Sequence, residues 1–433
     1  MGTLKFSIRM LKKEYKKSMV YTLTLSLTIA VTFLFFNIID NVYLMNERHT
    51  NASLSGIDIP FSSTLSFIII IFCAFMIIFA NNFYISRKTK EIAIMTMSGS
   101  GFMDTTMYLF YQNLIMTLMA FPLGIGLGAI ASIGVNQCIY QYLSYQVPMF
   151  YIPVNAIFDT MICICAIIGA QLVYASGFVY RKDIQYMLSQ ENRNTLKDER
   201  ILQIPTSVYW VVYVLGFILL VSTPYTSSSA LFPCFIGAVA TGGMIKYCFS
   251  SLFMKLKQNH FIANRLWLIA LSNLYYSLRR AVLLIGIYAV SSSVMIAIMI
   301  SQQNNPREMV TSIVGFVVII LLLLASILYK YSMEATTRKM FYYNLYKLGY
   351  TNHQLLSIIK KEVSSFYAIL LGLPFVYIIV TLIQAFIHQG ISLEFMITVI
   401  LTQILSALIA GVLTYISYKN AVLKALKEGV HYE

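Results

Sequence analysis

Hydrophobic residues run along this chain in long uninterrupted stretches that alternate with short polar and basic segments. An apolar stretch of about 20 residues is long enough for one helix to cross a membrane, and continuous hydrophobicity disfavours a membrane β-barrel, whose strands alternate. We therefore predict an all-α polytopic membrane protein with about ten transmembrane helices. The expected spans are residues 19–39, 64–84, 109–135, 155–178, 207–222, 230–249, 282–301, 310–329, 363–387 and 395–417.

The positions of the basic residues predict how these spans are oriented. Every Lys and Arg except Arg48 and Arg307 falls in segments that share one side of the membrane when the N-terminus is cytoplasmic. Because cytoplasmic loops are enriched in Lys and Arg, we expect a multi-pass cell-membrane protein with both termini in the cytoplasm. The formal net charge of +14 suits an anionic lipid leaflet, and its spread over several short loops does not indicate nucleic-acid binding.

Two distant segments, residues 87–114 and 337–363, repeat one pattern. Each places a basic amphipathic stretch that contains a glycine between two spans. Gly99 in the first segment corresponds to Gly349 in the second. Similarity at this distance along a chain indicates an internal repeat, and both copies begin on the same side of the membrane. The sequence therefore predicts two parallel four-helix modules.

The repeat also sets the expected domains. Residues 4–17 carry apolar and basic stripes at helical spacing, which predicts an amphipathic helix at the membrane surface. Residues 261–280 repeat this amphipathic theme before the seventh span. We expect a first module at 1–178 that includes the N-terminal helix, a loop with two intervening spans at 179–258, and a second module at 259–433.

The two repeated segments hold the leading candidates for functional residues. A glycine there permits a helix to end and the chain to turn sharply into the next span, so a short rigid helix could pass force from a cytoplasmic partner into the membrane. The alternative is an amphipathic connector that rests on lipid. The candidates are Glu91, Ile92, Met95, Ser98 and Gly99 in the first segment and Phe341, Leu345, Leu348 and Gly349 in the second.

Small and polar residues inside the spans suggest further contacts. Gly124, Gly128 and Ser132 form a small-residue face in the third span, and Ser406 and Ala410 lie on such a face in the last span. These faces predict close helix packing within the chain, with dimer formation as the alternative. Thr28 and Thr32 in the first span either satisfy their hydroxyls on their own helix or form a polar seam against a substrate.

The short loop after the third span is rich in aromatic residues, including Tyr142 and Tyr145. Aromatic side chains concentrate at membrane interfaces, and their apolar rings and polar tips could also contact a lipid or a peptide. We therefore treat Tyr142 and Tyr145, together with Thr28 and Thr32, as a candidate substrate surface.

Several chemistries find no support in the sequence. No G-x-x-x-x-G-K-[ST] segment occurs, so the chain cannot hydrolyse ATP through a P-loop, and no metal-ligand or catalytic constellation emerges. The expected spans contain only Asp159 and Lys246 as ionisable residues, both near span ends. Ion-coupled transporters usually carry such residues within their spans, so the sequence argues against ion coupling. We expect no enzyme, no metal and no cofactor in this chain.

The succession of amphipathic helix, span, outer loop, span, "EIAIMTMSGSG" segment and glycine-rich third span resembles the FtsX-like permease module of ABC transporters. The ten-span arrangement resembles the BceB-type permeases. This resemblance implies a type VII, MacB-like system that works by mechanotransmission. The partner would be a separate cytoplasmic ABC ATPase subunit, a dimer, which binds ATP and Mg²⁺. A sensor kinase or a small membrane protein are further partners that the resemblance implies.

Relatives of this kind act in bacterial resistance to antimicrobial peptides, so the resemblance implies export, removal or sensing of an amphipathic substrate such as a peptide or lipid. One departure is large: the loop between the seventh and eighth spans, "QQNNPREM", is too short to be the extracytoplasmic domain of BceB-type permeases. Two alternatives stay open. One is a secondary transporter or channel without ATP coupling. The other is an ABC-type regulator of cell-wall enzymes or signalling that transports nothing.

Overall fold

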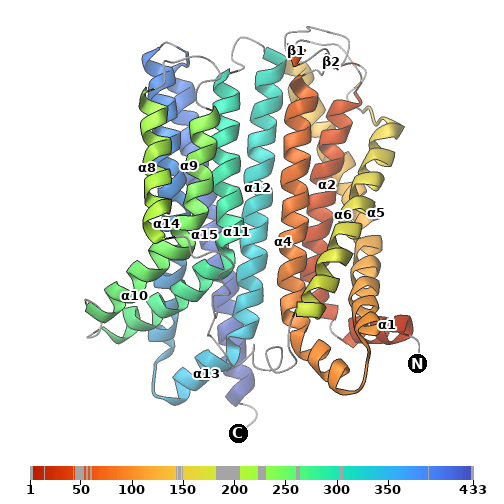
Figure 1. Ribbon diagram of the computed structural model, residues 1–433, viewed down its shortest axis with the longest axis vertical. Helices are drawn as coiled ribbons and strands as arrows, with labels where there is room; N and C mark the ends of the chain where they lie inside the picture. The colour runs from red at the N-terminus through yellow and green to blue at the C-terminus, as the bar shows by residue number, and fades with distance from the viewer. Residues whose placement is uncertain are drawn as a thin grey trace. The chain divides into compact units, whose positions relative to one another are not determined.

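The computed structural model describes residues 3–13, 15–41, 43, 53–54, 57–58, 61–142, 144, 148, 150–181, 205–222, 231–259, 264–301, 306–388 and 390–430. The chain divides into two compact units, Met1–Glu199 and Arg200–Glu433, each with its own packed helices. Almost every described residue lies in a helix (Figure 1). This confirms the prediction of an all-α polytopic membrane protein.

The described part of unit 1 contains four long helices and one short one. The short helix α1 lies at the end of the unit where α4 turns into α5 (Figure 1), and α2 packs against α4, α5 and α6. A small two-stranded antiparallel sheet stands at the opposite end. The elements are α1 (Thr3–Lys13), α2 (Tyr15–Ile39), β1 (Ser53–Leu54), β2 (Ile57–Asp58), α4 (Phe61–Met97), α5 (Phe102–Tyr142) and α6 (Val154–Arg181).

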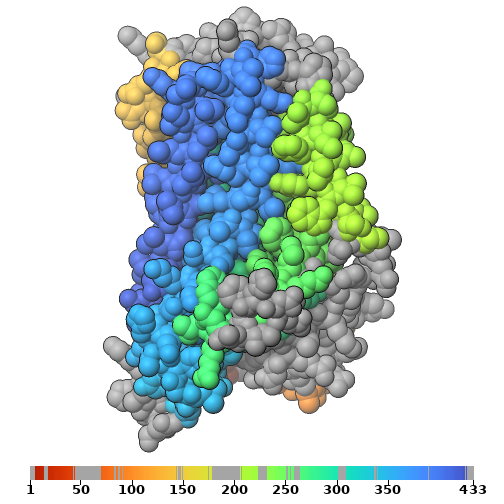
Figure 2. All heavy atoms as spheres, turned by 90° about the vertical axis from the view of Figure 1, so that its left-hand side faces the viewer, coloured from red at the N-terminus to blue at the C-terminus, as the bar shows by residue number. Residues whose placement is uncertain are grey.

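In the described part of unit 2 there are four long helices, α11, α12, α14 and α15, and four shorter ones, α8, α9, α10 and α13. Helices α14 and α15 lie side by side, with α8 next to α14 and the short α13 below them (Figure 2). A π-helical turn, Met244–Phe249, joins α9 to α10. The helices are α8 (Thr206–Ser222), α9 (Leu231–Gly243), α10 (Ser250–Asn259), α11 (Arg265–Ser301), α12 (Pro306–Thr337), α13 (Lys339–Lys347), α14 (Asn352–Ile387) and α15 (Leu393–Val430).

Each of the ten expected spans coincides with an apolar helix. Eight helices in the described residues are long and apolar enough to cross a membrane, and two shorter apolar stretches, Ile70–Asn81 and Ser207–Ser222, account for the other two. Several helices extend well beyond the apolar stretch that predicted them, as α4 and α14 do. The intervening helices α8, α9 and α10, expected as a separate segment, pack within unit 2.

The two units repeat one another in their buried positions as well as in their sequence. On α5 and α14, corresponding residues are buried at successive turns, as Gln112 and Glu362 are, and Gly128 and Ile378. Two elements differ: unit 1 has α1 and α2 where unit 2 has the single helix α11, and unit 1 has the single helix α4 where unit 2 has α12 and α13. The segment 261–280 was expected to be a second amphipathic helix at the membrane surface, and its apolar residues Leu271, Leu274 and Leu278 are buried on α11.

Small residues allow α5 to approach α2 closely in unit 1. A Cβ atom added to Gly124 would lie 2.7 Å from Ile29, and one added to Gly128 would lie 2.9 Å from the carbonyl oxygen of Ala30. The buried Ser132 hydroxyl donates to the Gly128 carbonyl at 2.7 Å, so it needs no partner on another helix. The small-residue face of the third span is thus used inside the unit.

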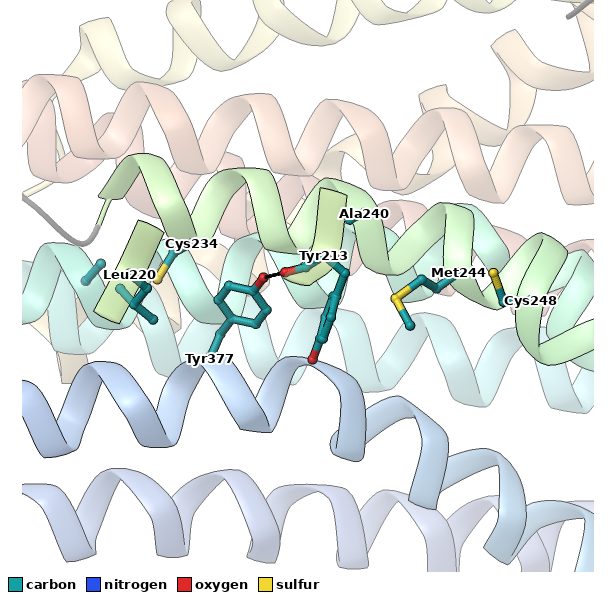
Figure 3. Close-up of a cluster of buried hydrophobic side chains, with 8 residues drawn as sticks. Tyr213, Leu220, Cys234, Ala240, Met244, Cys248 and Tyr377 are labelled. Atoms are coloured by element: carbon teal, nitrogen blue, oxygen red, sulfur yellow. Dashed lines mark hydrogen bonds between the residues drawn. The ribbon is translucent and has the colours of Figure 1, made fainter. Parts of the chain in front are cut away.

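Two tyrosines connect α8, one of the additional helices of unit 2, to α14. Figure 3 shows Tyr377 reaching from α14 to Tyr213 on α8, where its hydroxyl donates to the Tyr213 carbonyl. The Tyr213 hydroxyl donates in return to the Leu373 carbonyl at 2.9 Å. Leu220, Cys234 and Met244 complete this apolar cluster. The exchange of hydrogen bonds fixes α8 and α14 in register.

Candidate functional site

The first repeated segment contains a sharp helix-to-helix turn at Gly99, two residues after the end of α4. Gly99 has a φ of +87°, in the left-handed region that favours glycine. Its N–H donates to the Thr96 carbonyl at 3.1 Å, and the Ser100 N–H donates to the Met95 carbonyl at 3.1 Å. These two bonds form a Schellman motif, which satisfies the last carbonyls of α4 and redirects the chain into α5. We call residues 91–104 the first elbow.

The second repeated segment has the same geometry. Gly349 has a φ of +92°, its N–H donates to the Tyr346 carbonyl at 2.9 Å, and the Tyr350 N–H donates to the Leu345 carbonyl at 3.2 Å. The next helix then starts with a capping box between Thr351 and Gln354. We call residues 338–354 the second elbow. Both glycines that the sequence aligned are therefore the residues at which the chain turns.

We expect Gly99→Ala and Gly349→Ala each to destabilise its elbow by about 1–2 kcal/mol, since a Cβ is disfavoured at positive φ. No atom lies within 4 Å of a Cβ added to either glycine, so the cost is one of backbone conformation alone. Hydrogen exchange of the Ser100 and Tyr350 amides would measure the opening. Asparagine, which tolerates this conformation, should restore most of the protection. If these amides were equally protected from exchange in the alanine variants and in the native protein, the two glycines would not be required for the turns.

Each elbow has a buried face and an exposed face. Ile92 and its counterpart Tyr342 are fully buried, and Leu345 is nearly so. Leu345, expected on a stripe that docks a partner, thus packs against its own unit. The exposed face is unusually apolar: Ile94, Met97, Phe102 and Met103 in the first elbow, and Met340, Phe341, Tyr346 and Leu348 in the second. Two candidates, Glu91 and Met95, are half-buried at the margin between the two faces. Three others, Ser98, Gly99 and Gly349, are exposed.

A chain of hydrogen bonds anchors the first elbow to the spans of unit 1. Glu91 accepts from Lys88 at 3.0 Å and from the Tyr108 hydroxyl at 2.8 Å. Gln112 donates to the same hydroxyl at 2.8 Å and accepts from Tyr84 at 2.9 Å. Glu91 is therefore a structural link between α4 and α5, a role that its sequence position alone did not reveal.

Helix α1 packs against the same place. The ring of Phe6 lies 5.5 Å from that of Tyr108, and the buried Ser7 hydroxyl donates to the Tyr108 carbonyl at 3.4 Å. Met10, one turn further along, packs on the cluster that contains Ile92. The amphipathic helix thus braces the first elbow, while Ile8 on its other side stays exposed.

The second elbow is anchored by charges instead. Arg338, between α12 and α13, donates to Glu362 of α14 at 2.7 Å, and Lys330 lies 3.1 Å from Glu334. Lys330, Glu334 and Glu362 are essentially inaccessible to solvent. We call these four residues the Arg338 cluster. Its two positive and two negative charges balance, which is the condition under which buried charges are tolerated.

Neighbouring polar groups complete the Arg338 cluster. Ser277 of α11 donates to Glu334 at 3.3 Å, and the Lys330 ammonium lies 4.0 Å from the centroid of the Tyr331 ring. Although burial opposes it, the Glu362 carboxylate next to the guanidinium raises the pKa of Arg338 well above its ordinary value. The arginine therefore stays charged at any accessible pH.

This cluster corrects an inference drawn from the sequence. The expected spans contained only Asp159 and Lys246, yet the candidate membrane-spanning segments Met309–Ala335 and Asn352–Ile387 include Lys330, Glu334 and Glu362. These residues lie where the helices run past the predicted span ends and remain buried in protein. The signal was present in the spacing of Lys330, Glu334 and Arg338, which places them on one helical face.

The remaining candidates lie elsewhere. Thr28 and Thr32 are buried in unit 1, and their hydroxyls donate to the carbonyls of Thr24 and Thr28. They therefore present no surface to a substrate, which corrects that reading. Tyr142 is exposed at the end of α5, whereas Tyr145 lies outside the described residues.

On α15, Ala410 is buried and the Ser406 hydroxyl donates to the Gln403 carbonyl at 2.9 Å. Among the residues that the structure describes, no group of three His, Cys, Asp or Glu side chains is placed to hold a metal ion.

Comparison with known proteins relates the first elbow to a permease family. Residues 63–184 match the family model described as FtsX-like permease C-terminal, which covers α4, the first elbow, α5 and α6. Over 164 residues the chain is 24% identical to an uncharacterized ABC transporter permease, YvcS, from Bacillus subtilis (strain 168). That stretch covers 38% of this chain and 24% of the relative. The chain thus spans about a quarter of the length of this relative.

Proposed function

We propose that this chain is the membrane subunit of a bacterial ABC transporter, and that its two elbows receive force from a separate cytoplasmic ATPase. The observation that carries the proposal is the duplicated elbow: two Schellman turns with the same buried face and an exposed apolar face. The family match includes the first elbow. The second elbow repeats its geometry, which extends the assignment to unit 2.

The exposed face of each elbow is suited to a protein partner. Met97, Met103, Met340 and Leu348 each have about two thirds or more of their surface exposed, at 65%, 65%, 67% and 77%. Apolar side chains gathered at the charged ends of membrane helices are costly to leave in water and mark a contact surface. Methionine and leucine fill grooves readily because their side chains adapt to the opposing shape.

The proposed mechanism is mechanotransmission. ATP hydrolysis in a partner dimer would move the elbows, and the anchoring contacts, Glu91 with Tyr108 in unit 1 and Arg338 with Glu362 in unit 2, would pass the movement into the spans. At the other end of unit 1, exposed aromatic side chains such as Tyr142 would contact an amphipathic peptide or lipid at the membrane interface. In this proposal the elbows and both chain termini face the cytoplasm.

Co-purification tests the proposal. We expect the chain to retain an ATPase encoded beside it through detergent purification, and Met97→Asp combined with Leu348→Asp to reduce retention at least tenfold, since both place a charge in an apolar contact. Lys360→Asp, an exposed change on α14 outside both elbows, is the matched control. The proposal would be refuted if the double variant retained the ATPase as well as the native chain does and the purified chain hydrolysed ATP by itself. Leu345→Asp would be uninformative because Leu345 is buried.

A further inference from the structure

Arg338 occupies a mechanical junction in unit 2. It is the single residue between α12 and α13, with φ of −89° and ψ of 6°. Its N–H donates to the Glu334 carbonyl at 2.9 Å, and its carbonyl accepts from Tyr342 at 3.1 Å. The backbone hydrogen bonds on both sides therefore survive a change of direction at this residue. Any movement of α13 relative to α12 must rotate the chain at Arg338.

The side chain of Arg338 contacts every long helix of the repeated module. The guanidinium donates to Glu362 of α14 at 2.7 Å, to the Tyr418 hydroxyl of α15 at 3.4 Å and to the Asn273 carbonyl of α11 at 3.4 Å. On α12, an oxygen of Glu334 lies 3.9 Å away, at the outer limit of an ion pair. Planar, forked donor geometry lets one arginine serve two carboxylates.

Both carboxylates retain capacity for another hydrogen bond. Glu334 Oε1 and Glu362 Oε2 are buried and have no hydrogen-bond partner among the described residues. An unpaired oxygen of a buried carboxylate is costly, because it has lost its water without gaining a donor. A guanidinium that moved from Glu362 toward Glu334 would give Glu334 Oε1 a donor, while Glu362 Oε1 would lose its donor. The two arrangements are thus similar in their hydrogen bonding, and in neither of them do all four carboxylate oxygens of Glu334 and Glu362 have a donor.

We propose that Arg338 has two resting positions, one on Glu362 and one on Glu334, and that exchange between them carries a movement of α13 into α11, α14 and α15. This inference deepens the proposed function by naming the residue that transmits force in unit 2, and it rests on that function only for the source of the force. Arg338 acts as a positioning residue. Its two discrete partners make the junction bistable, which is the property that a coupling element requires.

Distance measurements on the isolated chain test the exchange. In a cysteine-free chain in lipid nanodiscs, spin labels at Leu348→Cys on the second elbow and Asn420→Cys on α15 report the position of α13; both sites are exposed. We expect two distances. Glu362→Gln should shift their population ratio toward the Glu334 position by about tenfold, and Glu334→Gln should shift it by a similar factor in the opposite direction, since a hydrogen bond to a charged group is at stake.

The opposite signs separate this proposal from a purely structural role, in which both substitutions loosen α13 alike. Lys360→Gln, which removes an exposed charge two residues from Glu362, should leave the ratio unchanged. Shifts of the same sign, or one unchanging distance in the native chain, would overturn the proposal. If the glutamine variants fail to fold, Arg338→Lys provides the test. Lysine lacks the forked guanidinium, so we expect a single narrow distance between the spin labels. Two distances in this variant would contradict the proposed exchange. These readouts need no ATPase, so they stand even if no partner binds.

Discussion

Replacing Arg338 with leucine is expected to lower the free energy of unfolding by about 3–5 kcal/mol, because it leaves the buried Glu362 carboxylate without its cation. Glu362 is fully buried, and its ion pair with Arg338 is the shortest in the Arg338 cluster, at 2.7 Å. Titration of the detergent-solubilised chain with dodecyl sulfate, followed by circular dichroism, would measure the change.

The double variant Arg338→Leu with Glu362→Leu should recover much of that loss, because replacing a whole buried pair by apolar groups is often neutral. Arg265→Leu is the matched control, since Arg265 is exposed at the start of α11 in the same unit. A loss of less than 1 kcal/mol for Arg338→Leu, or a double variant no better than the single one, would show that the cluster contributes little to stability.

The second large effect concerns the contact between α2 and α5. We expect Gly124→Ala with Gly128→Ala to destabilise unit 1 by about 2–5 kcal/mol, since each added Cβ would overpack a close helix contact. At both positions the obstacle includes backbone, the Ser26 and Ala30 carbonyl oxygens at 2.9 Å, so rotating a side chain cannot relieve it. Thermal unfolding in detergent, followed by the loss of monomer on gel filtration, would report the effect.

Gly126 supplies the internal control for that experiment. It lies between Gly124 and Gly128 on α5, yet a Cβ added there meets no atom within 4 Å. Gly126→Ala should therefore be neutral or stabilising by up to about 1 kcal/mol, as expected from helix propensity. Equal destabilisation by Gly126→Ala and by the double variant would mean that helix flexibility, not close packing, explains these glycines.

Much of the fold was predictable because its determinants are local. Continuous apolar stretches fix the helices, and a glycine between two spans fixes each elbow, since only positive φ lets the chain reverse there. The alignment of Gly99 with Gly349 was read from sequence, and both glycines have left-handed backbone conformation. The helices α4 and α12 run past the ends of the expected spans, and α14 begins before its expected span, because buried polar residues such as Lys330 and Glu362 let these turns pack in protein instead of lipid.

The site was less predictable because burial depends on tertiary packing. An amphipathic stripe does not say which side meets protein, so Leu345 was included among the candidates for contact with a partner although it is buried. Charged residues near a span end were counted as a topology signal, and only the packing of α11, α14 and α15 around Arg338 shows that they form one cluster. For Thr28 and Thr32 the sequence left two interpretations open, and the structure agrees with the one in which the hydroxyls bond to their own helix.

Helix α4 runs without a break from Phe61 to Met97, whereas its counterpart in unit 2 changes direction between α12 and α13. An unbroken hydrogen-bonded helix transmits a displacement along its axis with little bending. A helix interrupted at one residue converts the same displacement into rotation about that residue. Equal strokes applied at the two elbows would therefore produce translation in unit 1 and tilting in unit 2, so a duplicated sequence yields two mechanically unequal halves.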